Sequence, residues 1–304
     1  MTNELPPVSY NFGANTPVEL IQSRLENLLA AGARRVMLEA SQLVKAADDR
    51  QYRKALMDGL SATGLVLFDV HALHGVMDSF GCPIPESEAY FLDIARKSLH
   101  TAAELGAETV TFHCARTRLV KNMAPPSGPI EDVNLSGAKS RILHELEILL
   151  PEAERCHVMI ALENLFLPSS TALFLTSIIK EMPHPFLGLN YDSGHALLLE
   201  QQQDKKPSDI AEWIQIGWTD DTVAFQPDQL DEMLNHVITA HLHDNHGKTD
   251  EHLLPGDGIA NWPHIIQRLK TAPRLLSLQS EVSSKCYLEE PGCQVKAFQN
   301  VGFN

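Results

Sequence analysis

The chain has 304 residues, of which 44% are hydrophobic and 21% charged, the composition of a globular protein that can bury a large core. Its 24 Lys and Arg against 39 Asp and Glu give a formal net charge of −15, which argues against binding to nucleic acid or an anionic membrane through bulk charge. No apolar run is long enough to span a membrane, and the start, MTNELPPVSYNFG, lacks the pattern of a secretory signal.

The five cysteines are scattered, odd in number and without a CxxC pair. This pattern is typical of reduced thiols and disfavours a zinc site built from thiolates. We therefore expect a cytoplasmic protein with no membrane partner, no nucleic-acid partner and no organic cofactor.

Eight short runs rich in Val, Leu, Ile and Phe follow one another along the chain, and helix-like segments separate them. In chain order the expected strands are SYNFG (9–13), RRVMLEA (34–40), GLVLFDVHAL (64–73), ETVTFHC (108–114), HVMIALENL (157–165), FLGLNYDSG (186–194), VITAHLHDN (237–245) and LLSLQSEV (275–282). The segments 18–33 and 87–107 carry apolar residues at three- and four-residue spacing and end with Gly followed by Ala, as is typical of helices.

Eight strands that alternate with helices predict a parallel sheet covered by helices. In one continuous chain of about 250–300 residues, the economical closure is a (β/α)8 TIM barrel of the α/β class. We therefore predict a single barrel domain over residues 1–304. An open, doubly wound sheet is the alternative, and it is disfavoured because no GxGxxG motif opens a helix after the first strand.

Two segments are longer than the minimal repeat needs. Residues 114–132 follow the fourth strand, are rich in proline and contain Arg116, Arg118 and Lys121, whereas residues 197–234 follow the sixth strand. Both come after strand C-termini, where the loops of a barrel build active sites. We expect rim insertions or lids there; solvated insertions or contacts of a homo-oligomer are the alternative.

Acidic and imidazole residues recur at or just after the C-terminal ends of six successive predicted strands. In chain order they are His71, His113, Glu163, Asp192 with His195, His241 and Glu281, and the segment after the seventh strand adds Asp250 and His252. Because these strand ends converge in a closed barrel, we expect all nine side chains to face one pocket.

Metal binding explains this mixture of residue types better than packing does. Imidazole and carboxylate groups bind ions such as Zn, Mn and Co, and buried charges are costly unless they are paired or bound to metal. Nine ligands exceed the needs of one ion, so either two or three ions bind or some of these residues hold substrate.

The remaining histidines are expected to have ordinary packing or surface roles, with one exception. They are His74, His100, His144, His157, His184, His236, His246 and His264. The exception is His243, two residues after His241, which we expect to support the site or to face the substrate.

Four motifs together resemble the xylose isomerase-like TIM-barrel superfamily: ALEN, LNYDSGH, AHLHDN…GKTDEHLLPGDG and the final SE. The resemblance extends from the second strand to Glu281. In the isomerase and epimerase branch it implies one divalent ion (Zn, Mn, Co or Mg), with His195 contacting the substrate. The ligands implied for that ion are Glu163, Asp192, His241 and Glu281.

In the endonuclease IV branch, the same resemblance implies three zinc ions held by nine ligands. The matching residues are His71, His113, Glu163, Asp192, His195, His241, Asp250, His252 and Glu281, and none is missing. A zinc-dependent phosphoester hydrolase therefore stays open as the alternative function.

The resemblance favours a metal-dependent isomerase or epimerase that acts on a sugar, polyol or sugar phosphate through an enediolate. It implies acid/base roles for Glu163 and Glu281. It also implies that His195 contacts the substrate, and we expect His71, His113 and Arg116 to contact it as well.

Three departures from the endonuclease pattern support this choice. FHCART lacks the Pro-Gly that follows this histidine in that branch, HALHGVMDSF shows no match to its DNA-probing loop, and LLPGDGIANW looks more like the sugar phosphate isomerases. A non-catalytic sugar-binding or assembly protein is a third hypothesis, which the intact ligand set disfavours.

Overall fold

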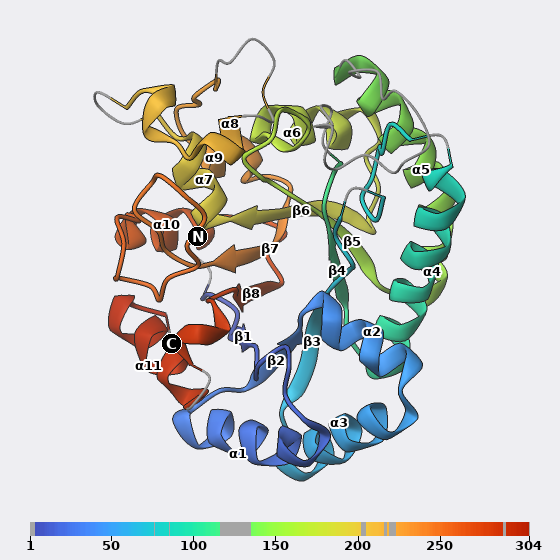
Figure 1. The fold of residues 1–304 in the computed structure, drawn as a ribbon, viewed down its shortest axis with the longest axis vertical. Coiled ribbons are helices and arrows are strands. Elements are labelled where there is room, and N and C mark those ends of the chain that lie inside the picture. The colour runs from blue at the N-terminus through green and yellow to red at the C-terminus, as the bar shows by residue number, and fades with distance from the viewer. Residues whose placement is uncertain are drawn as a thin grey trace.

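A computed structural model describes residues 4–75, 77–84, 86–115, 135–201, 205–215, 218, 223–287 and 290–303. Eight parallel strands close into a barrel in the order β1 to β8, with helices around it (Figure 1). The strands are Val8–Tyr10 (β1), Arg35–Leu38 (β2), Val66–His71 (β3), Thr109–Phe112 (β4), Met159–Glu163 (β5), Leu187–Asp192 (β6), Val237–Leu242 (β7) and Ser277–Ser280 (β8). Each overlaps one predicted segment, and the predicted (β/α)8 barrel is confirmed.

The helices fill the connections between strands. They are Ile21–Ala31 (α1), Ala40–Asp48 (α2), Arg50–Thr63 (α3), Ser87–Leu105 (α4), Leu135–Cys156 (α5), Ala172–Glu181 (α6), Ser193–Leu199 (α7), Glu212–Gln215 (α8), Gln229–Met233 (α9), Trp262–Leu269 (α10) and Gly292–Val301 (α11). Helices α1 and α4 end at Gly32 (φ 106°) and Gly106 (φ 82°), in the left-handed conformation that glycine adopts at little cost. Within the described residues, no helix is both long and apolar enough to cross a membrane.

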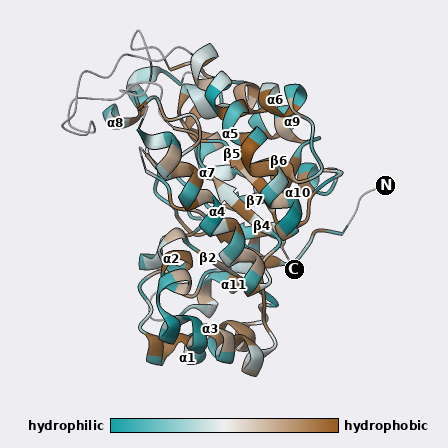
Figure 2. Ribbon diagram, turned by 90° about the vertical axis from the view of Figure 1, so that its right-hand side faces the viewer, coloured by the Kyte–Doolittle hydropathy of each residue, from teal (hydrophilic) through white to brown (hydrophobic). Residues whose placement is uncertain are grey.

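The strands contribute buried residues between two polar layers. All six residues of β6 and all six of β7 are buried, and Figure 2 shows β5 and β6 largely brown inside helices of mixed colour. In one polar layer, the buried Asp69 carboxylate accepts hydrogen bonds from Ser9, Thr109 and Ser277. The polar groups of this layer hydrogen-bond to one another, whereas the polar groups at the C-terminal strand ends surround a cavity.

The structure describes little of the first long segment expected at the rim and most of the second. Residues 116–134, with Arg116, Arg118 and Lys121, lie outside the described residues. In the second segment, Leu198, Ile214 and Trp218 belong to an apolar cluster that also contains Leu165 and Phe166 from the loop after β5. The Trp218 indole donates a hydrogen bond to the Phe166 carbonyl at 3.0 Å. This part of the segment 197–234 therefore packs on the rim of the barrel.

Candidate metal centre

The C-terminal ends of the strands surround a cavity of about 1090 Å³. Its wall includes six of the nine predicted ligands: His71, His113, His195, Asp250, His252 and Glu281. The other three, Glu163, Asp192 and His241, are fully buried close to them. The structure thus brings together residues from six different strands and the loops that follow them.

Glu163, at the end of β5, is the centre of one group. Its Oε1 lies 3.1 Å from His241 Nδ1, and its Oε2 lies 3.3 Å from His71 Nε2 and 3.0 Å from His113 Nε2. Glu281, just after β8, also approaches His241 Nδ1, at 2.9 Å. One carboxylate therefore faces histidines from three strands, an arrangement suited to bridging two cations.

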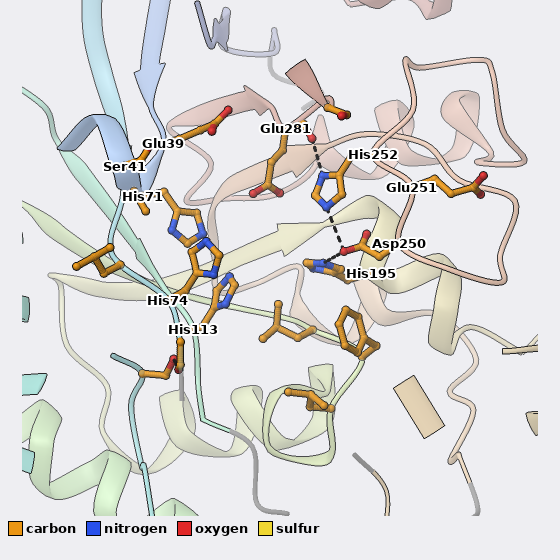
Figure 3. A pocket seen from close by; sticks show the side chains of 18 of the residues that line it. Glu39, Ser41, His71, His74, His113, His195, Asp250, Glu251, His252 and Glu281 are labelled. Carbon is orange, nitrogen blue, oxygen red and sulfur yellow. Dashed lines mark hydrogen bonds and ion pairs between the residues drawn. The ribbon is translucent and has the colours of Figure 1, made fainter. Parts of the chain in front are cut away.

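A second group lies across the cavity, around Asp250. Its Oδ2 is 3.3 Å from His195 Nε2 and 3.1 Å from His252 Nε2. Figure 3 shows these three residues on one side, His71 and His113 on the other, and Glu281 between the two sets.

Asp192, at the end of β6, connects the two groups. Its backbone pairs with that of His241 in the β6–β7 register, and its Oδ1 lies 3.3 Å from His195 Nδ1. His243 Nε2 lies 3.1 Å from both Asp192 oxygens, and the His243 ring stacks on His252 with centroids 3.9 Å apart. His243 therefore holds Asp192 and His252 in place.

Hydrogen bonds fix which ring nitrogen of each histidine faces the site. Carbonyl oxygens only accept, so Nδ1 of His71 donates to the Ala72 carbonyl and Nδ1 of His252 to that of Glu281, both at 2.7 Å. The Nε2 atoms are left to face the carboxylates. An acceptor that holds the second ring nitrogen in this way is the usual support of a histidine that binds a metal.

Among the residues that the structure describes, no lysine or arginine forms an ion pair with the carboxylates of the site. Glu163, Asp192, Asp250 and Glu281 form ion pairs with histidines. Burial alone would raise the pKa of Glu163, but His241 and His113 outweigh it and hold that pKa well below its usual range. The pKa of Asp250 is likewise held low by His195 and His252, against the effect of burial.

The same pairs act on the histidines in the opposite direction. Burial would lower the pKa of His241, yet Glu281 and Glu163 raise it well above its ordinary value. Asp250 raises the pKa of His252 to about 10, again against the effect of burial. When no ion is bound, the positive charge of the protonated imidazole rings balances the negative charge of the carboxylates. Four clustered acids balanced in this way fit a site for divalent cations.

The cavity also holds two groups that the sequence reasoning did not place there. The His74 ring lies 5.0 Å from that of His71 and 4.7 Å from that of His113, and burial lowers its pKa to about 3. Glu39, just after β2, lines the same cavity, and burial, assisted by the charge of Glu281, raises its pKa. The sequence did contain a signal for Glu39, because this residue lies at the C-terminal end of the second predicted strand, as the predicted acidic ligands do in their own strands.

An apolar wall completes the cavity at the rim. Phe166, after β5, meets the Trp213 ring edge-on at 5.0 Å and the His195 ring at 5.3 Å. Trp213 belongs to α8 and is partly exposed. Such a wall suits the apolar face of a sugar ring.

Comparison with known families agrees with the observed fold. The family model described as "Xylose isomerase-like TIM barrel" matches residues 25–283, most of the chain. The chain belongs to this family. No match was found among curated proteins.

Several solved structures share the fold at low sequence identity. A D-tagatose 3-epimerase-like protein is 18% identical with a TM-score of 0.69, and covers 97% of this chain and 96% of its own. The 3-keto-D-glucoside 4-epimerase YcjR from E. coli is 14% identical with a TM-score of 0.67, over 97% and 99%. A Mycobacterium smegmatis protein in complex with magnesium is 15% identical with a TM-score of 0.66, over 97% and 95%.

Proposed function

We propose that this protein is a divalent-metal-dependent isomerase or epimerase of a sugar, polyol or sugar phosphate. The observation that carries the proposal is the convergence of two carboxylates from distant strands on one ring atom. Glu163 and Glu281 lie 3.1 and 2.9 Å from His241 Nδ1. Two of the proteins that share the fold are sugar epimerases or resemble one by their names, which supports a carbohydrate substrate.

The residues fit a divalent ion, with Glu163, Asp192, His241 and Glu281 as the proposed ligands. Imidazole and carboxylate donors suit Zn, Mn, Co or Mg in different degrees. When bound, the ion supplies a Lewis acid that polarises a substrate carbonyl and the hydroxyl beside it.

The proposed chemistry of the chain itself is proton transfer at carbon. One of Glu163 and Glu281 removes a proton from the carbon next to the carbonyl, which leaves an enediolate, and the other carboxylate returns a proton. Return to the neighbouring carbon isomerises the sugar, and return to the opposite face of the same carbon epimerises it. His195, His71 and His113 hold substrate oxygens. We also propose that Arg116, which lies outside the described residues, contacts the substrate.

Phosphoester hydrolysis is the second candidate, and a specific observation favours it. His195, His243, Asp250 and His252 form a further group of possible ligands, and the one-ion isomerase gives Asp250 and His252 no role. Zinc ions there would stabilise charge on a phosphoryl group and lower the pKa of an attacking water. Against this candidate, Lys285 is the only lysine or arginine among the described residues that line the cavity.

Metal analysis combined with a substrate screen tests the proposal. Protein purified without chelator should carry about one Mn, Co or Mg per chain and should interconvert at least one sugar, polyol or sugar phosphate. Two or three zinc ions per chain, with hydrolysis of a model phosphodiester and no sugar conversion, would establish the second candidate instead.

Substitution of a proposed catalytic acid provides the matched test. Glu281→Gln should lower kcat for sugar conversion by about 10²–10⁴-fold, because the amide cannot exchange a proton with carbon. The control is Glu251→Gln, since Glu251 also lines the cavity but pairs with His246 instead of the predicted ligands. Full activity of Glu281→Gln would remove Glu281 from the catalytic role.

A further inference from the structure

Outside the cavity, the described residues contain one more group of metal-ligating side chains: His100, Glu152 and Cys156. The group joins α4 and α5, which pack side by side on the outside of the barrel (Figure 1). Each residue offers one ligand atom, and the three atoms lie within 4.8 Å of one another. None of the three belongs to the predicted catalytic set.

Helix geometry explains why these side chains meet. Glu152 and Cys156 are four residues apart on α5 and so lie on one face of that helix. His100 reaches across from α4, and its Nε2 pairs with Glu152 Oε1. The second oxygen, Glu152 Oε2, is held by Arg155 from the same helix. The carboxylate is thus oriented with one oxygen directed at the imidazole.

Burial and access are both suitable for a small ion. The Glu152 side chain is 10% exposed and Cys156 is half-buried, whereas the His100 side chain is 54% exposed. An ion can therefore enter from solvent past the imidazole and reach two donors that are shielded from competing water.

We propose that His100, Glu152 and Cys156 form a second metal site, selective for Zn²⁺ and similar thiophilic divalent ions. Imidazole nitrogen, carboxylate oxygen and thiolate sulfur are the three zinc-ligand types, and water completes a tetrahedron. Arg155 stays on the other carboxylate oxygen, so Glu152 binds through a single oxygen. The site goes beyond the proposed isomerase function and does not depend on it.

Binding at this site exchanges protons for the ion. The ion takes the place of the contact between His100 Nε2 and Glu152 Oε1, and its bond to sulfur releases the proton of the Cys156 thiol. The bound ion joins α4 to α5, the helices that follow β3 and β4.

Titration of the full chain with Cd²⁺ tests the site, because a cadmium–thiolate bond has its own ultraviolet charge-transfer band. The wild-type protein should show this band, saturating at one thiolate-bound Cd²⁺ per chain. Cys156→Ser should abolish the band, and His100→Gln and Glu152→Gln should weaken Cd²⁺ binding at this site by roughly tenfold or more. Circular dichroism spectra of the variants should match the wild type.

Two other cysteines give matched controls. Cys114 lines the main cavity and Cys293 is half-buried elsewhere, so Cys114→Ser and Cys293→Ser should keep the band. Absence of the band in the wild type, its persistence in Cys156→Ser, or its loss in Cys114→Ser would each overturn the proposal.

Discussion

His252 is fixed more firmly than a loop histidine usually is. Its Nδ1 donates to the Glu281 carbonyl at 2.7 Å, its Nε2 lies 3.1 Å from Asp250, and its ring stacks on that of His243. Its backbone also adopts φ 51°, a conformation that residues other than glycine adopt at some cost. These contacts hold Nε2 toward the cavity, beside Asp250 and outside the set of ligands proposed for a single ion.

Removal of this ring therefore separates the two candidate functions. In a one-ion isomerase, His252→Ala should keep the metal content and leave kcat/KM for the sugar within about an order of magnitude of the wild type. In a hydrolase with three ions, it should lose at least one zinc per chain together with phosphodiesterase activity. His246→Ala is the control, because His246 is an exposed histidine of the same loop that pairs with Glu251. Metal content and steady-state kinetics measure both outcomes.

The raised pKa values of the histidines predict proton release when the ion binds. His241, His195 and His252 hold protons near neutral pH when no ion is bound, since their carboxylate partners outweigh burial. Coordination needs the ring lone pair, so metal affinity should rise with pH across the neutral range. Calorimetry in two buffers of different ionisation enthalpy measures the protons released. Affinity that is independent of pH would contradict this assignment of charge.

The raised pKa of His252 also affects the stability of the protein when no ion is bound, and this effect has the opposite dependence on pH. The folded-state pKa of His252, about 10, lies above its ordinary value of 6.5. Its contribution to stability is therefore fully present below about pH 6.5 and is lost as the pH rises through about 10. Acid therefore weakens metal binding, whereas it favours the ion pair that protonated His252 forms with Asp250 when no ion is bound.

At the scale of elements, the loop after β7 is organised by one buried carboxylate, Asp244. The Asp244 backbone pairs with Leu253 as an antiparallel bridge, which returns the chain toward the barrel. Its side-chain oxygens accept from four donors: the amides of Asn245, Gly256 and Ala260 and the indole of Trp262. The loop that carries Asp250 and His252 is therefore fastened at both ends to a single side chain.

Asp244→Asn should release this loop. The NH2 group that replaces one carboxylate oxygen cannot accept hydrogen bonds, so at least one buried donor loses its partner, and the free energy of unfolding should fall by about 1–3 kcal/mol. Metal affinity should fall as well, because Asp250 and His252 lose their fixed positions. Asp257→Asn, an exposed acid of the same loop, is the control. Urea unfolding and metal titration measure the two effects, and unchanged values in both would show that the loop is held by other contacts.

The elements and much of the site could be predicted because both follow from short-range patterns. Alternating apolar runs and helical spacing gave the strand and helix order, and parallel strands then bring residues as distant as His71 and Glu281 to one cavity. The position of His74 could not be predicted, since it depends on the path of the loop after β3. His243 was expected near the site, but its hold on Asp192 depends on the register of β6 and β7.

At the scale of the whole molecule, the candidate metal centre draws its residues from β3 to β8 or the loops that follow these strands. An ion held by the proposed ligands Glu163, Asp192, His241 and Glu281 would connect segments more than 100 residues apart with contacts that the unfolded chain lacks. An ion that binds only the folded state at 100 times its Kd adds about 2.7 kcal/mol to stability. For a domain of this size, such a change corresponds to a Tm shift of several degrees.

Chelation should therefore lower the Tm of the protein by roughly 4 °C, and the lost stability should return with Mn²⁺ or Zn²⁺. The experiment is best done on the Cys156→Ser variant, in which the proposed site between α4 and α5 cannot contribute. Amide hydrogen exchange should locate the effect: protection should fall in β5, β6 and β7, whose ends carry Glu163, Asp192 and His241, and much less in the outer helices α1 and α11. An unchanged Tm, or a loss of protection confined to the outer helices, would mean that these side chains do not share an ion, because an ion bound at their convergence cannot leave without loosening the strands that hold it.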